Sequence, residues 1–411
     1  MMRSLVVPLA FLTSAAALAG GKTDEDAVAT DTVTGVRPPT LQVAYVDRDS
    51  QIAYTKALEA YKGKEYPAFE YYGAAALGMD IAFVHDVRAG VEKVYLRDYK
   101  GAKEHFEGLN QKYPDAAILP CGQILIWQSM MMENIDFAYE SQYNTAHRNA
   151  LEALEAAQKK PGNDAWENVL LTAVVGVEAV HQFRHDELST AFKLGLEAMT
   201  YADKAQKLAP NFADLQLAYG LLNYWASSIF LTAGGIDWKE DKRVEGITQI
   251  KKAELQGTFL RPAASYALAL TFLEEGKKRD AYLATLRNQR LYPASVVNNI
   301  VMARVDMHNG DYAGAEKALQ AVVAAAPENT RVHYLLGLCY MRWDKLPEAD
   351  AALDRYLAVT DLDPETRGQA LYVKGRVAQK RKDTRAAKKL YEEAWKVGKV
   401  KKAKERLDKL D

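Results

Sequence analysis

The chain has 411 residues, of which 49% are apolar and 26% are charged, and its formal net charge at pH 7 is −1. This composition is that of a folded protein, and the length allows two or three ordinary domains or one extended array of repeats. The nearly neutral charge argues against a dedicated nucleic-acid-binding protein, which would carry a clear basic excess.

The first residues have the pattern of a secretory signal. Arg3 provides the positive start, an apolar run covers 5–18, and Ala17-Leu18-Ala19 matches the small-x-small cleavage pattern. We therefore predict a signal peptide at 1–19 and an exported protein, periplasmic or extracellular, that is soluble after cleavage. Residues 20–49 are rich in Thr, Asp and Ala and lack an apolar period, which predicts a flexible linker.

Everything after residue 49 has a helical pattern, interrupted at Pro, Gly and Asn. No segment alternates apolar and polar residues in the way a half-buried strand requires. The sequence therefore predicts an all-α protein.

Small residues and turn residues recur at a fixed interval of 34 positions in the C-terminal third. The matching sets are Ala269, Ala303 and Gly337; Ala281, Ala315 and Ala349; Gly276 and Gly310; Pro293 and Pro327. A spacing of 38 then relates Gly337 to Gly375 and Ala349 to Ala387, so four residues are inserted near 361–368. The same pattern appears earlier at Gly90, Tyr99, Ala102, Phe106 and Pro114.

A helix–turn–helix unit of 34 residues resembles the tetratricopeptide repeat (TPR), and the chain resembles an exported bacterial protein of that family, with clear motifs at about 83–114 and 262–397. The resemblance implies a right-handed α-solenoid that binds proteins and does not catalyse reactions. We expect divergent TPR-like helices at 50–261, regular repeats at 262–397 and a basic capping helix at 398–411. No cofactor is expected.

In such repeats the first helix of each unit lines the concave face, and the register assigns thirteen residues to that face. They are Tyr266, Leu270, Arg304, Met307, His308, Arg331, Tyr334, Met341, Arg342, Tyr372, Arg376, Gln379 and Lys380. Arginine binds carboxylates with a bidentate fork, and Tyr and Arg are common at interface hot spots. We therefore predict a protein or peptide partner that is acidic and has apolar anchors, and no nucleic acid.

An alternative function concerns residues 212–238, a long apolar helix followed by Gly234-Gly235. Together with 239–293 this region resembles the T-component of TRAP transporters, a periplasmic repeat protein that partners a solute-binding protein. That resemblance implies an accessory protein holding a small apolar ligand or a solute-binding protein. A continuous cavity in 212–231 would favour it, and a filled core would favour the scaffold.

Catalytic and metal motifs are weak. Glu178, His181 and His185 share one helical face and are suitable zinc ligands, but the HExxH order is missing, so no metal is predicted. Nucleophile elbows, phosphate loops and dinucleotide fingerprints are absent from the sequence, which argues against an enzyme.

The C-terminal end is strongly basic, with 15 Lys or Arg against 6 Asp or Glu from Ala370 to Asp411. A terminal repeat helix needs a polar outer face, so a capping role explains most of this charge. Peripheral contact with an anionic membrane surface is the alternative.

Overall fold

The structure is a computed structural model that describes residues 66–160, 163–233, 240–360 and 362–410. For residues 229–233 it describes the backbone alone. The described residues form helices and connecting turns without a strand, as predicted. The predicted signal peptide, the linker and the Gly234-Gly235 pair lie outside the described residues.

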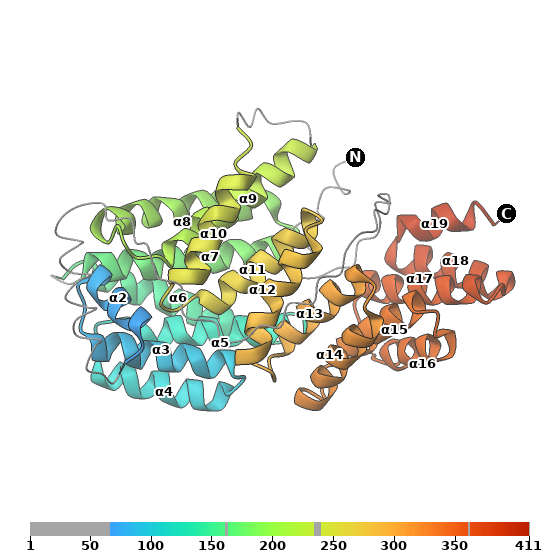
Figure 1. Cartoon of the computed structure of the whole chain (residues 1–411), viewed down its shortest axis with the longest axis horizontal. Helices are drawn as coiled ribbons and strands as arrows, with labels where there is room; N and C mark the ends of the chain where they lie inside the picture. The colour runs from blue at the N-terminus through green and yellow to red at the C-terminus, as the bar shows by residue number, and fades with distance from the viewer. Residues whose placement is uncertain (1–65, 161–162, 234–239, 361, 411) are drawn as a thin grey trace.

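Eighteen helices follow one another in the described chain. They are α2 (Ala68–Leu77), α3 (Ile81–Tyr95), α4 (Tyr99–Lys112), α5 (Ile118–Asn134), α6 (Glu140–Ala157), α7 (Asp164–Arg184), α8 (Leu188–Leu208), α9 (Leu215–Ala233), α10 (Arg243–Gln256), α11 (Arg261–Glu274), α12 (Lys278–Leu291), α13 (Val296–Asn309), α14 (Tyr312–Ala325), α15 (Arg331–Arg342), α16 (Leu346–Leu357), α17 (Pro364–Lys380), α18 (Thr384–Gly398) and α19 (Lys401–Leu407). From α3 to α18 they pack as antiparallel pairs that stack into an α-solenoid (Figure 1).

Within a pair, a glycine on the first helix lets a large side chain of the second helix approach closely. A Cβ atom added to Gly337 would lie 2.6 Å from Cγ of Leu353, and one added to Gly90 would lie 2.6 Å from a ring carbon of Phe106. Glycine and partner are sixteen positions apart in both pairs. The early unit around Gly90 therefore has the same internal packing as the C-terminal repeats.

The turn between the two helices of a pair has the same backbone conformation in successive repeats. The residue that reverses the chain has a left-handed conformation, with φ of 68° at Gly276, 82° at Gly310, 65° at Asp344 and 63° at Lys382. These positions are separated by 34, 34 and 38 residues, as the repeat pattern predicts. The connection between α16 and α17 is six residues long, against five between α14 and α15, whereas α17 has 17 residues and α15 has 12, so most of the extra length lies at the start of α17.

The apolar helix α9 crosses α10 at close range. A Cβ atom on Gly220 would lie 2.7 Å from the carbonyl oxygen of Gly246, so only glycine permits this crossing. Tyr224 and Trp225 of α9 are buried in the core that α9, α10 and α11 share. The described side chains of α9 therefore fill a core. Among the described helices, none has the length and apolar character needed to span a membrane.

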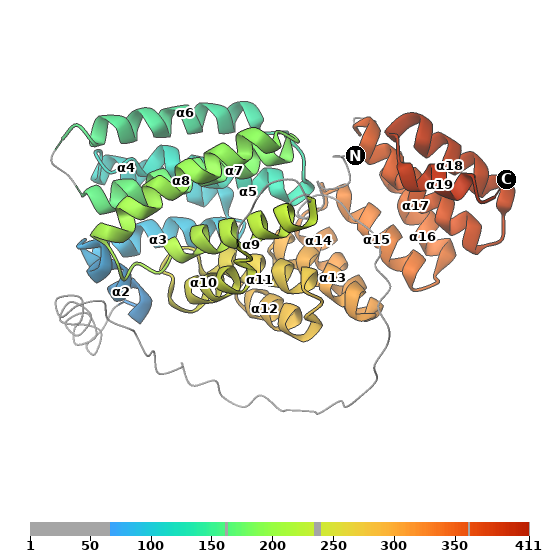
Figure 2. The same cartoon turned by 90° about the horizontal axis from the view of Figure 1, so that it is seen from above.

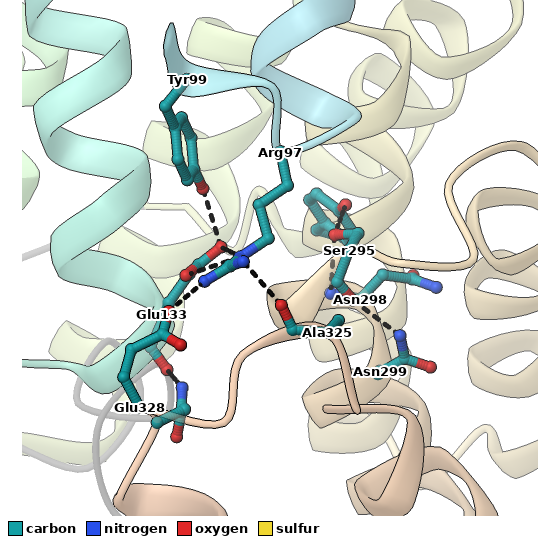
Figure 3. A network of polar contacts seen from close by, with 10 residues as sticks. Arg97, Tyr99, Glu133, Ser295, Asn298, Asn299, Ala325 and Glu328 are labelled. Carbon is teal, nitrogen blue, oxygen red and sulfur yellow. Dashed lines mark hydrogen bonds and ion pairs between the residues drawn. The ribbon is translucent and has the colours of Figure 1, made fainter. Parts of the chain in front are cut away.

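The solenoid curls so far that its N-terminal helices meet the connections between α12 and α15 (Figure 2). Arg97, in the turn after α3, donates to Glu133 Oε1 at 2.8 Å, to the carbonyl oxygen of Ala325 at 2.7 Å and to Glu328 Oε1 at 2.5 Å (Figure 3). Asn329 Nδ2 donates to the carbonyl oxygen of Glu133 at 2.8 Å. We call these five residues the clasp. The clasp joins α3 and α5 to the connection between α14 and α15.

The C-terminal end is covered by α19, which is shorter than the predicted capping segment 398–411 because α18 continues to Gly398. Ala403 is fully buried and Val400 is 5% exposed, while Leu407 and Leu410 pack against the same core. The apolar side of this segment faces the last repeat, which leaves its lysines on the outside.

Candidate partner-binding site

Four of the predicted arginines lie on α13, α15 and α17, the first helices of three successive C-terminal repeats. Arg304 lies on α13, Arg331 and Arg342 at the two ends of α15, and Arg376 on α17. The pKa of Arg304 is lowered to about 10, first by burial and then by the positive charges of Arg331 and Arg342. Burial also lowers the pKa of Arg342, and Arg376 adds to the effect. Arg304 is therefore close enough to Arg331 and Arg342, and Arg342 to Arg376, for their positive charges to repel each other.

The repeat explains this gathering of like charges. Arg304 and Arg376 occupy the same position in their units, separated by one 34-residue and one 38-residue interval, with Leu338 between them. His308, Arg342 and Lys380 occupy a second equivalent position. Arg304, Arg331 and Arg376 are half-buried and Arg342 is exposed, although burial is the first cause of the lowered pKa of Arg304, Arg331 and Arg342. These arginine side chains are therefore partly desolvated but still accessible from solvent.

Two predicted tyrosines stand behind the arginines. Tyr334 and Tyr372 are 8% and 7% exposed. Burial raises the pKa of Tyr334, while Arg331, Arg342 and Arg376 act in the opposite direction. The two rings therefore form an apolar floor beside the cations, with little surface of their own left for a partner.

Three other predicted residues are aliphatic or methionine side chains that pack between helices. Leu270, Met307 and Met341 are 9%, 4% and 0% exposed and belong to the core between helices. This corrects their predicted place in the groove, because the spacing rule assigns a helix face but does not tell whether a neighbouring helix covers it. We leave these three residues out of the proposed site.

Three more predicted residues have partners inside the chain. The hydroxyl of Tyr266 lies 3.1 Å from Oγ of Ser295, and Lys380 donates to Asp344 at 2.8 Å. Gln379 Oε1 accepts from Tyr391 at 2.7 Å and from Arg406 at 3.1 Å. His308 is exposed at the edge, and burial together with Lys278 and Arg342 lowers its pKa.

Sequence reasoning missed a fifth arginine, Arg184, at the end of α7. Its pKa is lowered to about 10, by burial first, and Arg331 contributes to the lowering. Its guanidinium stacks on Phe137 at 4.6 Å and donates to the carbonyl oxygen of Asp136, whereas Nε and Nη1 are buried and have no hydrogen-bond partner among the described residues. Because α7 belongs to the divergent half, the 34-residue register could not reach it. We call Arg184, Arg304, Arg331, Arg342 and Arg376 the arginine row.

The family of the repeats is decided by their sequence pattern together with this geometry. A family model for the tetratricopeptide repeat matches residues 306–374. Residues 306–374 are therefore tetratricopeptide repeats. TPR proteins generally act as scaffolds that bind other proteins or peptides, so a concave surface is where a partner is expected.

Several solved structures resemble the chain in fold. A tetratricopeptide repeat protein from Parabacteroides merdae is 15% identical and covers 69% of this chain and 98% of its own, with a TM-score of 0.41. The human IFIT1 dimer with m7Gppp-AAAA is 12% identical and covers 90% and 87%, with a TM-score of 0.46. Yeast Tom70 is 13% identical and covers 88% of each chain, with a TM-score of 0.36. No curated protein matches the chain, and the likeness to these structures concerns the fold alone.

The structure replaces one of the three residues that the sequence offered as weak metal ligands. Glu178 accepts hydrogen bonds from Tyr143 at 2.8 Å and from Gln182 at 2.6 Å. The carboxylate that faces both histidines is Glu140 of α6, whose Oε1 lies 3.3 Å from His181 Nε2 and 2.7 Å from His185 Nε2. Sequence spacing could not find Glu140, because it lies 41 positions from His181 on another helix.

Proposed function

We propose that this TPR protein is a non-catalytic adaptor that binds an acidic segment of a partner protein along the arginine row. Carboxylates of the partner would take the place of water around the guanidinium groups. Arginine suits this role because its planar fork forms two parallel hydrogen bonds with one carboxylate. Apolar side chains of the partner would rest beside Tyr334 and Tyr372, at the floor of the same surface.

The observation that carries the proposal is the mutual repulsion of successive arginines. Burial is the first cause of the lowered pKa of Arg184, Arg304 and Arg342, and neighbouring arginines add to it: Arg331 acts on Arg184 and Arg304, Arg342 on Arg304, and Arg376 on Arg342. Holding like charges in a partly desolvated surface costs free energy in the unbound protein. An acidic ligand removes that cost on binding, so the row favours a partner of opposite charge.

Two further facts support an external partner. No ion pair of Arg342 or Arg376 is formed within the described residues. Arg184 keeps two buried N–H donors without a partner in the same part of the chain, and buried donors of this kind are rare in proteins unless a ligand or water satisfies them. Among the described residues, unsatisfied N–H donors at Arg184 and positive charge without an ion pair at Arg342 and Arg376 therefore occur together in the arginine row.

Affinity capture from cells that produce the protein tests the proposal, with mass spectrometry as the readout. The bait is the wild-type chain beside the double variant Arg342→Glu, Arg376→Glu. The matched control, Arg279→Glu with Arg385→Glu, makes the same change in net charge at exposed positions outside the row. We expect acidic partners that are lost with the double variant and kept with the control. Equal capture by all three baits would contradict the proposal.

We also propose that the adaptor works outside the cytoplasm, in the periplasm or cell envelope or as an extracellular protein. The support is the sequence of residues 1–19, with its positive start, apolar run and small-x-small site. Expression of the full chain in its source, followed by fractionation and N-terminal sequencing, tests this. Export requires a mature N-terminus near residue 20, and an intact Met1 in the cytoplasmic fraction would contradict it.

The transporter-accessory alternative has less support. It requires space for a small apolar ligand in residues 212–231, and the side chains of 229–231 lie outside the described set. In the described part, Tyr224 is 0% and Trp225 is 8% exposed. A filled core of this kind favours the scaffold.

A further inference from the structure

We infer that Glu140, His181 and His185 form a binding site for a divalent transition-metal ion, with Zn²⁺ as the ion that fits the ligands best. This site is independent of the arginine row. Two imidazoles and one carboxylate are a common three-ligand set for zinc, which leaves a fourth position to water. We call these three residues the metal triad.

The fold gathers the metal triad from two helix ends. His181 and His185 are four positions apart and lie on one side of the last turn of α7, with His185 as its C-cap. Glu140 is the first residue of α6. A helix C-terminus carries a partial negative charge that favours a cation, and a carboxylate is stabilised at a helix N-terminus. Both helix ends therefore support the charge distribution of a metal site.

The distances suit one small ion. Ligand atoms in a tetrahedral zinc site lie about 3.3 Å apart, given metal–ligand bonds of about 2.0–2.1 Å. Glu140 Oε1 lies 3.3 Å from His181 Nε2, and the candidate ligand atoms of all three residues lie within 4.8 Å of one another. His185, at 2.7 Å from the same oxygen, is hydrogen-bonded to it and must move outward by a few tenths of an ångström. The side chains of Glu140 and His185 are 36% and 32% exposed, which leaves them room to move.

One member of the metal triad is rigidly held. His181 is 1% exposed, and its ring lies 4.4 Å from that of Tyr143. Its Nδ1 is buried without a hydrogen-bond partner in the described chain, so the polar interactions of this ring are made through the nitrogen that faces Glu140.

The charges around the metal triad can balance a dication. Glu140 itself, Glu178 beside His181 and Asp136 beside Arg184 supply three carboxylates. Arg184 is the nearby cation, and its guanidinium is turned toward Phe137 and the carbonyl oxygen of Asp136. Bound zinc would join α6 to α7 at the end of the helix pair that carries Arg184.

The test is a titration of the full chain, stripped with a chelator, with Zn²⁺ alone. We expect one ion per chain, a higher melting temperature with zinc, and at least a tenfold weaker affinity in Glu140→Gln and in His185→Gln. His308→Gln is the matched control, because it removes an exposed imidazole outside the metal triad and should leave the affinity unchanged. Wild-type affinity in both triad variants would overturn the inference.

A second measurement needs no variant and covers the case in which a substitution disturbs folding. Co²⁺ bound to the wild-type chain should give the intense visible absorption of a tetrahedral site, and one equivalent of Zn²⁺ should abolish it. Weak octahedral absorption at all Co²⁺ concentrations would overturn the inference.

Discussion

Arg97 and Ala325 are 228 positions apart in the chain, yet Nη1 of Arg97 donates to the carbonyl oxygen of Ala325 at 2.7 Å. This contact helps to hold the curvature of the solenoid, because it joins the turn after α3 to the end of α14. The same guanidinium holds Glu133, which is 7% exposed. The position of Arg184 relative to the other four members of the arginine row therefore depends on the clasp.

Arg97→Ala should lower the free energy of unfolding by about 1–3 kcal/mol, because it leaves a largely buried carboxylate with fewer donors. Hydrogen exchange should also accelerate at the α14–α15 connection around Asn329. The control Lys93→Ala removes only an exposed ion pair with Asp98 and should change stability little. Unchanged hydrogen exchange at Asn329 in Arg97→Ala would show that the clasp does not hold the α14–α15 connection.

Close helix packing predicts a contrast between two alanines of α14. Ala315 is fully buried, whereas Ala313 is exposed on the same helix. Ala315→Leu should destabilise the protein by about 1–3 kcal/mol because the larger side chain forces the helices apart. Ala313→Leu should stay within about 0.5 kcal/mol. Urea denaturation measures both, and equal midpoints would contradict the assigned repeat register.

Stability should fall with rising pH because of Asp306. This carboxyl is 4% exposed, and burial, with a smaller effect of Asp311, raises its pKa to about 7. Between about pH 4 and 7 the unfolded chain releases the proton while the folded chain keeps it. The folded state therefore loses up to about 4 kcal/mol of stability between about pH 4 and 7. Above pH 7 its stability changes little.

Asp306→Asn removes this dependence, so its stability relative to wild type should increase from pH 5 to pH 8. Denaturation at the two pH values measures the difference. Asp280→Asn, at an exposed position in the first turn of α12, is the control. A difference between Asp306→Asn and wild type that is the same at both pH values would contradict the raised pKa.

The basic C-terminal segment gives a fourth prediction. If its outer face contacts membranes, the full chain should co-sediment with anionic vesicles at low salt and detach at high salt. Replacing the exposed Lys401 and Lys409 with Gln should reduce the bound fraction without affecting Ala403 and Val400, which anchor α19 to the core. No sedimentation of the wild type at any salt concentration leaves capping as the role of this segment.

The repeat could be predicted from the sequence because its cause is local. Gly337 must be small to admit Leu353, and Gly310 reverses the chain at φ 82°, so both positions recur with the unit. The curl of the solenoid could not be predicted, since the contacts of Arg97 with Ala325 and Glu328 join residues that no period relates. Long-range contacts of single side chains leave no pattern in one sequence.

The candidate site was predictable only in part, for the same reason. The register identifies the helix face of Arg304, Arg342 and Arg376, because equivalent positions of a repeat point the same way. It fails for Met341, which is fully buried by neighbouring helices, and for Arg184, which comes from a divergent unit. The pairing of His181 with Glu140 depends on how α6 packs on α7, which the spacing of residues on α7 cannot reveal.

The most direct test of the arginine row is the affinity of the purified chain for a fluorescent peptide of glutamates interrupted by leucines, measured by fluorescence anisotropy at several salt concentrations. The account predicts saturable binding that weakens with salt. In Arg342→Glu with Arg376→Glu the affinity should fall at least tenfold, about 1.4 kcal/mol, at unchanged helicity and melting temperature. Arg279→Glu with Arg385→Glu should bind like the wild type. Equal affinity of the two double variants would contradict the account and direct the search to another face of the solenoid.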